Sequence, residues 1–421
     1  MTRAPRGFRL LAVSSAVPYS VAEETFVQDE LTEMVRQEVD LTVVPMRLRL
    51  AHANAAARAS GLADATLAEP LVSGHVLRGA LRTVARRPGR SLRALGAVAR
   101  STRGLRNIGV NASSVVKALW LADIVRRRRI SHVHAYWLSH TATAALVAAQ
   151  IEGVPWSATA YRWDIDAANA LRPKLTTARF IRCADELGER QLMAIAASMG
   201  RASPVVLVRT GVVLPSPDAW LDTPIAARTL VCPAAFVEKK GHAVLFEAFR
   251  ALRSAQPAME LHLFGDGPLR TRIEQQVRDL DLLDGVHFHG FVPLEELRTF
   301  MISRRPICVL PSHPGADGQD EGIPVTLIEA MACGAPVVST RTGAIAHLVS
   351  DGCGLLVPPA DAAALQRAIL EVGDDVEAAD QRCRAAFERV RLEFDLRETT
   401  RRMIDLMARD DRPVLDRGFD R

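Results

Sequence analysis

The sequence predicts an α/β protein with two successive domains, each built around a parallel sheet. Three observations indicate this class. Short β-rich runs alternate with helical stretches, the 421 residues suit two domains, and 48% hydrophobic with 24% charged residues is typical of a globular chain. This composition argues against disorder or a coiled coil for the chain as a whole.

The first half of the chain shows the pattern of one such domain. A helix is expected at Phe26–Glu38, where periodic side chains lie four apart, and a helix of small residues at Thr141–Ile151. The N-terminal run Leu10–Ala16 has the faint look of a signal peptide, but its apolar stretch is short and favours a first strand. The expected strands are Arg9–Val13, Asp40–Val44, His132–Tyr136 and Trp156–Ala160.

A second series of elements follows Pro215-Ser-Pro217, the most linker-like stretch in the middle of the chain. Its expected strands are Thr229–Pro233, Glu260–Phe264, His287–His289, Ile307–Leu310 and Pro336–Ser339. Its expected helices are Ala243–Ala255, Leu269–Asp279, Glu295–Ser303 and Ile323–Cys333.

The positive charge is concentrated in one segment. The chain carries a net charge of +5, yet residues 70–120 contain nine Arg and one Lys and no acidic residue. This segment therefore contributes +10, and the remainder sums to about −5. Such a stretch indicates an anionic partner: a membrane face, a nucleic acid or a phosphorylated substrate. Nucleic acid is not expected, because Trp120 is the only aromatic residue of the segment and no stacking platform accompanies the charge.

The cysteines and apolar runs bound the compartment. Six Cys lie far apart without a Cys-x-x-Cys pair, which excludes the common zinc patterns and favours a reducing environment. No apolar run reaches 18 residues, so we expect no transmembrane helix. The sequence thus predicts a cytoplasmic protein.

Three turns of the second domain have the composition of ligand-binding turns. Sheets of this type bind ligands at the carboxyl ends of their strands, often at helix N-termini that suit phosphate. The candidate turns are 236–242, 265–270 and 311–322, and each follows a strand and precedes a helix. The last runs into a helix with Pro324 near its start and Gly334 just past its end.

Glu321 and Glu329 bracket the start of this last helix. If residues 323–333 are helical, the two carboxylates lie on the order of 10–12 Å apart. That separation matches one ligand with a sugar at one end, a ribose at the other and a diphosphate between them. The alternative is a capping acid followed by an exposed acid on a helix surface. The turns around the pair favour the ligand.

The run Leu310–Pro358, with Glu-Gly-Ile-Pro-Val-Thr-Leu-Ile-Glu-Ala-Met-Ala-Cys-Gly, resembles the donor-binding block of glycosyltransferase family 4. It is most similar to the branch that assembles bacterial exopolysaccharides, such as colanic-acid-type enzymes. The likeness is strong in the C-terminal half and weak between residues 45 and 130. Further matches are Lys239-Lys-Gly-His, Gly265-Asp-Gly-Pro, His289-Gly-Phe-Val-Pro and Glu24-Thr-Phe.

The resemblance implies the GT-B fold: two Rossmann-like doubly wound domains facing a central cleft, with a C-terminal helix crossing back to the first. We expect an acceptor-side domain at 1–210, a nucleotide-sugar donor domain at 211–393 and the returning segment at 394–421.

The resemblance also implies roles for individual residues. Lys240 is expected at the donor diphosphate, Glu329 at the ribose hydroxyls, and Glu321 with Gly322 at the donor sugar, which makes Glu321 and Lys240 the candidate catalytic residues. The donor is expected to be UDP- or GDP-linked, with no cofactor and no metal. The 11 His are scattered, and His287 and His289 alternate along a strand instead of converging with a carboxylate. The remaining candidate donor-binding residues are Lys239, Gly267, Ile323 and Pro324.

Two positions depart from the family pattern. Ala235 stands where the family usually has an arginine contact to phosphate, and Tyr161 stands where it usually has a histidine. Losing one charge-assisted contact costs roughly 1.5–3 kcal/mol. Arg162 and Lys239 could supply replacement charge, while Tyr161 could offer a hydroxyl to the donor sugar and Asp164 completes the pattern.

The expected function is that of a retaining glycosyltransferase, which moves a hexosyl unit from a nucleotide sugar to a lipid-linked surface polysaccharide. A catalytically silent GT-B protein acting as a binding or assembly partner is the alternative. An epimerase on the same fold is weaker, since no set of acids and bases for the sugar ring is evident.

The basic segment fits the first reading as two amphipathic helices that lie peripherally on an anionic inner membrane face. Arg78, Arg82, Arg86 and Arg90 fall four apart with leucines between them, and Arg93, Arg100, Arg103 and Arg106 continue the series. Solvated helix faces are the alternative reading.

Overall fold

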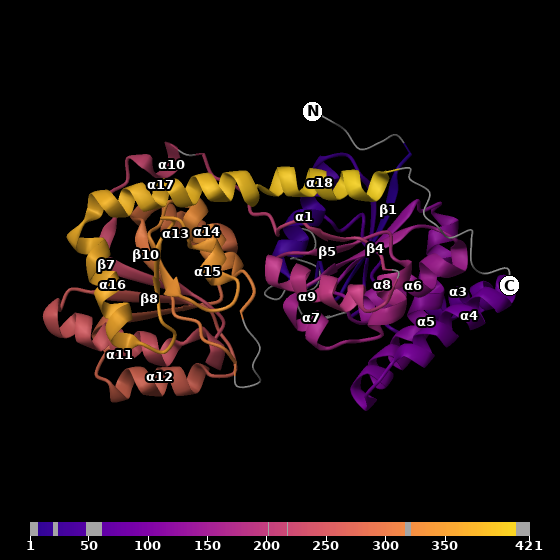
Figure 1. Ribbon diagram of the computed structural model, residues 1–421, viewed down its shortest axis with the longest axis horizontal. Helices are drawn as coiled ribbons and strands as arrows, with labels where there is room; N and C mark the ends of the chain where they lie inside the picture. The colour runs from indigo at the N-terminus through magenta and orange to yellow at the C-terminus, as the bar shows by residue number, and fades with distance from the viewer. Residues whose placement is uncertain are drawn as a thin grey trace. The chain divides into compact units, whose positions relative to one another are not determined.

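A computed structural model describes residues 7–19, 24–47, 61–200, 202–216, 218–315 and 321–409. The chain divides into two compact units (Figure 1). Unit 1 comprises Met1–Gly211 with Leu396–Arg421, and unit 2 comprises Val212–Asp395. Each unit holds a six-stranded parallel sheet, which confirms the predicted α/β class.

The sheet of unit 1 has the strand order β2-β1-β3-β4-β5-β6. Because the chain places β3 on the opposite side of β1 from β2, the strand order reverses at the β1–β3 pair. The central strands are buried along their whole length, as expected for a parallel sheet covered on both faces. The strands are β1 Arg9–Ser14, β2 Asp40–Pro45, β3 His132–Tyr136, β4 Trp156–Ala160, β5 Ile181–Cys183 and β6 Val205–Leu207.

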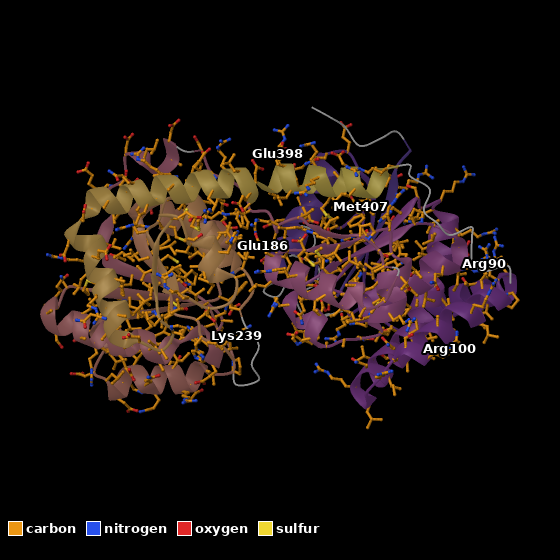
Figure 2. All side chains as sticks on the ribbon, viewed as in Figure 1. Arg90, Arg100, Glu186, Lys239, Glu398 and Met407 are labelled. Carbon is orange, nitrogen blue, oxygen red and sulfur yellow. The ribbon has the colours of Figure 1, made fainter. Side chains whose placement is uncertain are left out.

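The last helix of the chain belongs to unit 1, as predicted. This helix is α18, Leu396–Ala408. Its side chains Met403, Ile404 and Met407 belong to the same buried cluster as Val27 of α1, which spans Thr25–Arg36. Figure 2 shows Met407 on the inner side of α18 and Glu398 on its outer side. The other helices of unit 1 are α3 Gly74–Arg86, α4 Pro88–Ser101, α5 Leu105–Arg127, α6 His140–Glu152, α7 Arg162–Asp166, α8 Leu171–Thr177 and α9 Glu186–Ala197.

The basic segment differs from the prediction, because it forms two helices and the start of a third. Pro88 begins α4, since proline is favoured at a first helical position, and Gly104 precedes α5 with a φ of 81°. Arg103 therefore lies between helices, and Arg106 lies on α5.

Helix α5 is long and apolar enough to cross a membrane by length and composition alone. However, 61% of its most apolar window is buried inside unit 1, and Trp120, Leu121 and Ala122 belong to the core of that unit. This burial is typical of a core helix. Among the described residues, no other helix passes the same length and composition test.

The sheet of unit 2 has the order β12-β11-β10-β7-β8-β9. Counted from the first strand of the unit, this is the Rossmann order 3-2-1-4-5-6, and the direction of winding reverses between β7 and β10. Ligands bind doubly wound sheets at this switch point, outside the carboxyl ends of the strands. The strands are β7 Ala226–Pro233, β8 Glu260–Phe264, β9 Val286–Gly290, β10 Pro306–Leu310, β11 Val337–Thr340 and β12 Leu355–Val357.

The helices of unit 2 cover both faces of its sheet and close one hydrophobic core. Helix α14 begins after Pro324 and ends before Gly334, which adopts a φ of 67°, so the proline and glycine act as the predicted start and stop signals. The helices are α10 Asp218–Leu221, α11 His242–Ala255, α12 Arg270–Asp279, α13 Leu294–Arg304, α14 Val325–Ala332, α15 Ile345–Leu348, α16 Ala362–Asp374 and α17 Val376–Glu393, with short 3₁₀ turns at Glu238–Lys240 and Leu283–Gly285.

Candidate functional site

The turn after β7 is fitted closely against the turn after β10. Gly241 ends the 3₁₀ turn with a φ of 73°, and a Cβ there would lie 2.0 Å from the carbonyl oxygen of Pro311, so only glycine fits. The backbone N–H of His313 donates to the carbonyl of Lys239 at 3.0 Å. The two turns that flank the switch point of unit 2 are thereby held together.

Lys240 and Glu321 meet across this switch point. The Lys240 Nζ lies 3.1 Å from the Glu321 Oε2, and the Lys239 Nζ lies 3.8 Å from the same oxygen. The backbone of Glu321 is also fixed, since Ala344 donates its N–H to the Glu321 carbonyl at 3.0 Å. The two residues expected at the diphosphate and the donor sugar are therefore brought together from turns about 80 residues apart in the chain. Residues 316–320 of the same loop lie outside the described residues.

The turn after β8 forms the next wall of this site. Phe236 donates its N–H to the Asp266 carbonyl at 2.9 Å, and Leu269 donates to the Phe236 carbonyl at 3.1 Å. Gly267, an expected donor contact, lies between these two bonds and donates its own N–H to the Asp266 side chain at 2.7 Å. Ala235 is exposed in the turn after β7, so the arginine of the family pattern would stand at the surface here.

The start of α14 supplies backbone N–H groups to the same region. Gly322 and Ile323 are partly exposed in the approach to the helix, and Pro324 occupies the N-cap without a side-chain hydrogen bond. The first N–H groups of a helix carry a partial positive charge and suit phosphate. Because Glu321 does not cap this helix, the reading of Glu321 as a capping acid is wrong.

Glu329 has a partner that the sequence did not reveal. Arg298 of α13 donates from Nε to Glu329 Oε2 and from Nη2 to Oε1, both at 2.8 Å. The Glu329 side chain is 2% exposed and that of Arg298 11%, so the reading of Glu329 as an exposed surface acid is also wrong. No sequence spacing links the two residues, because they lie on different helices.

Unit 1 has an aromatic cluster at its own switch point. The Tyr161 ring lies 4.6 Å from that of Trp137 and 5.4 Å from that of Phe26, measured between centroids. Trp137 follows β3 with a φ of 77°, a conformation that is a genuine outlier for a bulky residue and that clusters at functional sites. Its indole N–H donates to Glu24, whose Oε2 accepts from the N–H groups of Ala16 at 2.7 Å and Val17 at 3.1 Å. Sequence reasoning singled out Tyr161 and missed Trp137.

Asp164 lies beneath this cluster and holds its backbone. The side chain is fully buried, and its Oδ2 accepts from the N–H groups of Leu138 at 2.9 Å and Tyr161 at 3.3 Å. Burial raises the pKa of Asp164 to about 7. The buried Lys174 holds the same turn by donating to three backbone carbonyls, one of them Leu138. Asp164 is thus placed to position the turn. Arg162 begins α7 and donates to Gln191 at 3.2 Å.

Part of the basic segment is used inside unit 1. Asp123, which is buried, lies 3.1 Å from Arg82 and 2.6 Å from Arg86, and the buried Lys117 donates to the carbonyls of Pro45 and Glu69. The other arginines of the segment are exposed, and Figure 2 shows Arg90 and Arg100 at the surface of the α3–α5 region. Large apolar side chains are exposed on the same helices: Leu77, Leu81, Val84, Leu92, Leu105 and Ile108.

One expectation about the histidines is wrong. His287 does converge with a carboxylate: its Nε2 lies 4.0 Å from Glu260 Oε1, and the Nε2 of His262 lies 3.5 Å from Glu260 Oε2. The sequence could not show this because Glu260 and His287 lie on different strands, and only the register of β8 against β9 brings them together.

The two parallel sheets and the returning α18 define a GT-B protein, and solved structures with this fold align over most of the chain. HepE of Anabaena, solved in complex with UDP, aligns with a TM-score of 0.66 at 15% identity, covering 94% of this chain and 99% of its own. Sucrose-phosphate synthase of Thermosynechococcus elongatus aligns with a TM-score of 0.63 at 18% identity, covering 94% and 98%. At such identities the likeness establishes the fold.

Residues 225–389 match the family Glycosyl transferases group 1, so unit 2 carries a domain of this family. The putative colanic acid biosynthesis glycosyltransferase WcaL of Escherichia coli is 36% identical over 186 residues, which is 44% of this chain and 46% of WcaL. The amylovoran biosynthesis glycosyltransferase AmsK of Erwinia amylovora is 36% identical over 177 residues, 42% of this chain and 43% of AmsK. The matched segment spans less than half the length of these relatives.

Proposed function

We propose that this protein is a retaining glycosyltransferase that moves a hexosyl unit from a nucleotide sugar to a lipid-linked surface polysaccharide. The observation that carries the proposal is the meeting of Lys240 and Glu321 at the β7–β10 switch point, with their charged atoms 3.1 Å apart. A cation beside a carboxylate is what a sugar diphosphate requires at its scissile end. The group 1 domain at residues 225–389 supports the same reaction class.

The reaction develops charge in two places, and the site has a group for each. Breaking the bond between the anomeric carbon and the diphosphate leaves an oxocarbenium-like sugar and a nucleotide diphosphate with growing negative charge. Lys240, Lys239 and the N-terminus of α14 would stabilise the diphosphate. The Glu321 carboxylate would accept hydrogen bonds from the sugar hydroxyls and hold the ring in place. Transfer is completed when the oxygen of an acceptor hydroxyl bonds to the anomeric carbon and its proton passes to the departing diphosphate.

Lys240 and Glu321 form an ion pair across the switch point. Donor binding would replace this contact, since the diphosphate takes the lysine and the sugar takes the carboxylate. Glu329 would accept hydrogen bonds from the ribose hydroxyls while Arg298 keeps its carboxylate oriented. The donor is proposed to be UDP- or GDP-linked, because HepE was solved with UDP and a mycobacterial relative is named as a GDP-mannose-dependent mannosyltransferase. No metal or cofactor enters this scheme.

The acceptor proposal rests on the relatives and on the α3–α5 surface. WcaL and AmsK are named for colanic acid and amylovoran biosynthesis, which favours a polysaccharide acceptor. The exposed arginines of α3 and α4 are interleaved with exposed leucines, among them Leu81 and Leu92. Such a face suits an anionic lipid surface, where each basic residue contributes about 1 kcal/mol. We propose cytoplasmic localisation with peripheral binding to that surface.

Nucleotide release tests the proposal. The purified chain is incubated with UDP- and GDP-sugars, with and without a membrane-lipid extract, and the freed nucleotide is measured. One donor should be turned over faster when the extract is present, and Glu321→Ala should abolish turnover. Glu329→Ala should abolish donor binding, while Glu274→Ala, an acid on α12 paired with Arg270, should leave both unchanged. Retained donor affinity in Glu329→Ala would contradict the site assignment.

A catalytically silent GT-B protein is the second candidate, favoured by Ala235 and Tyr161. The site lacks the family's arginine at one position, and the Tyr161 ring packs between Phe26 and Trp137 where the family has a histidine. Donor binding without turnover, unchanged by Glu321→Ala, would establish this second function.

A further inference from the structure

A cluster of three imidazoles and one carboxylate lies at the edge of the unit 2 sheet, apart from the donor-side residues. Glu260 and His262 are two residues apart on β8 and therefore point to the same face of the sheet. His287 of β9 is the register partner of His262, and His289 follows two residues later. Because β9 is the edge strand, the cluster is reached from solvent. The side chains of Glu260 and His287 are 48% and 43% exposed, and that of His262 is 9% exposed.

The side chains of Glu260, His262 and His287 bring one ligand atom each close together. The Glu260 oxygens lie 3.5 Å from the His262 Nε2 and 4.0 Å from the His287 Nε2, and all three ligand atoms lie within 4.8 Å of one another. Both Nε2 atoms are buried and make no hydrogen bond to any residue that the structure describes. In a tetrahedral zinc site with bonds of about 2.0–2.1 Å, neighbouring ligand atoms lie about 3.3 Å apart. The His262 and His287 rings are stacked at 25° with their centroids 4.7 Å apart, so metal binding would require ring rotations that turn both Nε2 atoms toward the ion.

A fourth residue orients the central imidazole. The Nδ1 of His262 lies 2.9 Å from the Nε2 of His289. A metal bound at the His262 Nε2 requires the proton on Nδ1, which then donates to His289. Outer partners of this kind fix the tautomer and orientation of metal-binding histidines. The His289 ring is itself stacked on Phe264, with centroids 4.1 Å apart.

We propose that Glu260, His262 and His287 form a binding site for a divalent transition metal ion, of which Zn²⁺ is the expected one, with His289 as the outer partner that orients His262. The two histidine nitrogens and the carboxylate are ligands that zinc prefers. Water completes the coordination on the exposed side. The ion would join β8 to the edge strand β9.

This site is independent of glycosyl transfer, and its test uses metal binding alone. The full chain is prepared without a histidine tag, and Zn²⁺ binding is measured by equilibrium dialysis with metal analysis. Visible absorption of the Co²⁺ form reports the coordination geometry. One equivalent of Zn²⁺ should bind, and His287→Ala and Glu260→Gln should each weaken it at least 10-fold. His289→Ala should weaken binding by about 10- to 100-fold without removing a ligand.

His75→Ala is the matched control. His75 also faces a carboxylate, with its Nδ1 3.0 Å from Glu69, but no second histidine joins that pair in the described part of unit 1. Its loss should leave Zn²⁺ affinity unchanged. Glu260→Gln keeps the size of a half-exposed side chain, and its circular dichroism and metal-free unfolding should match the parent chain. Absence of stoichiometric Zn²⁺ binding would overturn the proposal. So would a Zn²⁺ affinity in His287→Ala and Glu260→Gln equal to that of the parent chain.

Discussion

Removing the guanidinium of Arg298 should destabilise unit 2 strongly, because the buried Glu329 carboxylate would lose its two hydrogen bonds from that side chain. Arg298→Met deletes two charge-assisted hydrogen bonds of 2.8 Å to a side chain that is only 2% exposed. Breaking a buried pair by removing one partner costs about 3–5 kcal/mol. The second acid near Arg298, Glu295, is 83% exposed at 3.7 Å and changes this figure little.

A double variant distinguishes the net stability that the ion pair contributes from the cost of removing only one of its partners. Arg298→Met with Glu329→Met replaces both charges by side chains of similar size, and most of the lost stability should return, since buried ion pairs are often no better than well-packed apolar residues. Arg298→Lys keeps the charge but cannot donate two parallel hydrogen bonds to the carboxylate, and its stability should lie between that of Arg298→Met and that of the double variant. Donor affinity should be weakened in Arg298→Met and lost in the double variant, which also lacks the Glu329 carboxylate.

Hydrogen exchange of peptides from α13 and α14 is the suitable assay. Tryptophan fluorescence would report mainly on unit 1, which holds four of the five tryptophans. The single variant should exchange faster in both helices, and the double variant should approach the parent chain. Unchanged exchange in Arg298→Met, or a double variant less protected than the single one, would refute the reasoning.

Three further predictions concern other parts of the molecule. Gly241→Ala should lower the melting temperature and weaken donor binding, because its Cβ would lie 2.0 Å from a carbonyl, whereas Gly352→Ala at a similar φ of 79° meets no atom within 4 Å and should cost only backbone strain. Burial lowers the pKa of His132 to about 3 and that of His134 well below its usual value. The stabilising contribution of the two neutral histidines is therefore present above about pH 6.5 and is lost as the pH falls, because the unfolded chain then binds protons that the folded chain does not. Urea unfolding followed by tryptophan fluorescence between pH 6 and 5 should show that His134→Gln removes about one proton from this pH dependence. Replacing Arg93, Arg100 and Arg103 together by Gln should weaken co-sedimentation with vesicles containing phosphatidylglycerol and leave donor binding unchanged. The same change at the exposed Arg250, Arg278 and Arg367 of unit 2 should alter neither property. An equal loss of co-sedimentation in both triple variants would argue against a membrane-binding face at α3–α5.

The sequence predicted the strands well where the signal is local. The predicted β3, β4 and β8 have the observed bounds, and Thr229–Pro233 falls inside β7. The strands β5, β6 and β12 were missed since each has only three residues, too few to show a period. The Arg82 and Arg86 contacts with Asp123 were missed for another reason, as they join residues about 40 positions apart.

The candidate site divides along the same line. Lys240 and Glu321 were found because each belongs to a short motif, and the strand order then explains why they meet. Arg298, Trp137 and Glu260 belong to no motif, and each acquires its role through a partner on another element. Sequence motifs therefore identify Lys240 and Glu321 one at a time, while contacts between residues on different elements are set by packing.

This division also bears on the two departures from the family pattern. If catalysis depended only on motif residues, Ala235 and Tyr161 would predict a severe loss of activity. Lys239, which the sequence already suggested as replacement charge, lies 3.8 Å from Glu321, and the structure adds Trp137, which donates to Glu24 and packs against Tyr161. Lys239→Met should therefore weaken turnover more here than in a relative that keeps the arginine, since one charge-assisted contact accounts for roughly 1.5–3 kcal/mol and no arginine stands at position 235 to share it. Measuring Lys239→Met alone and together with Ala235→Arg decides the point. Rescue of the first change by the second would mean that the two cations serve the same phosphate, and independent effects would mean that they do not.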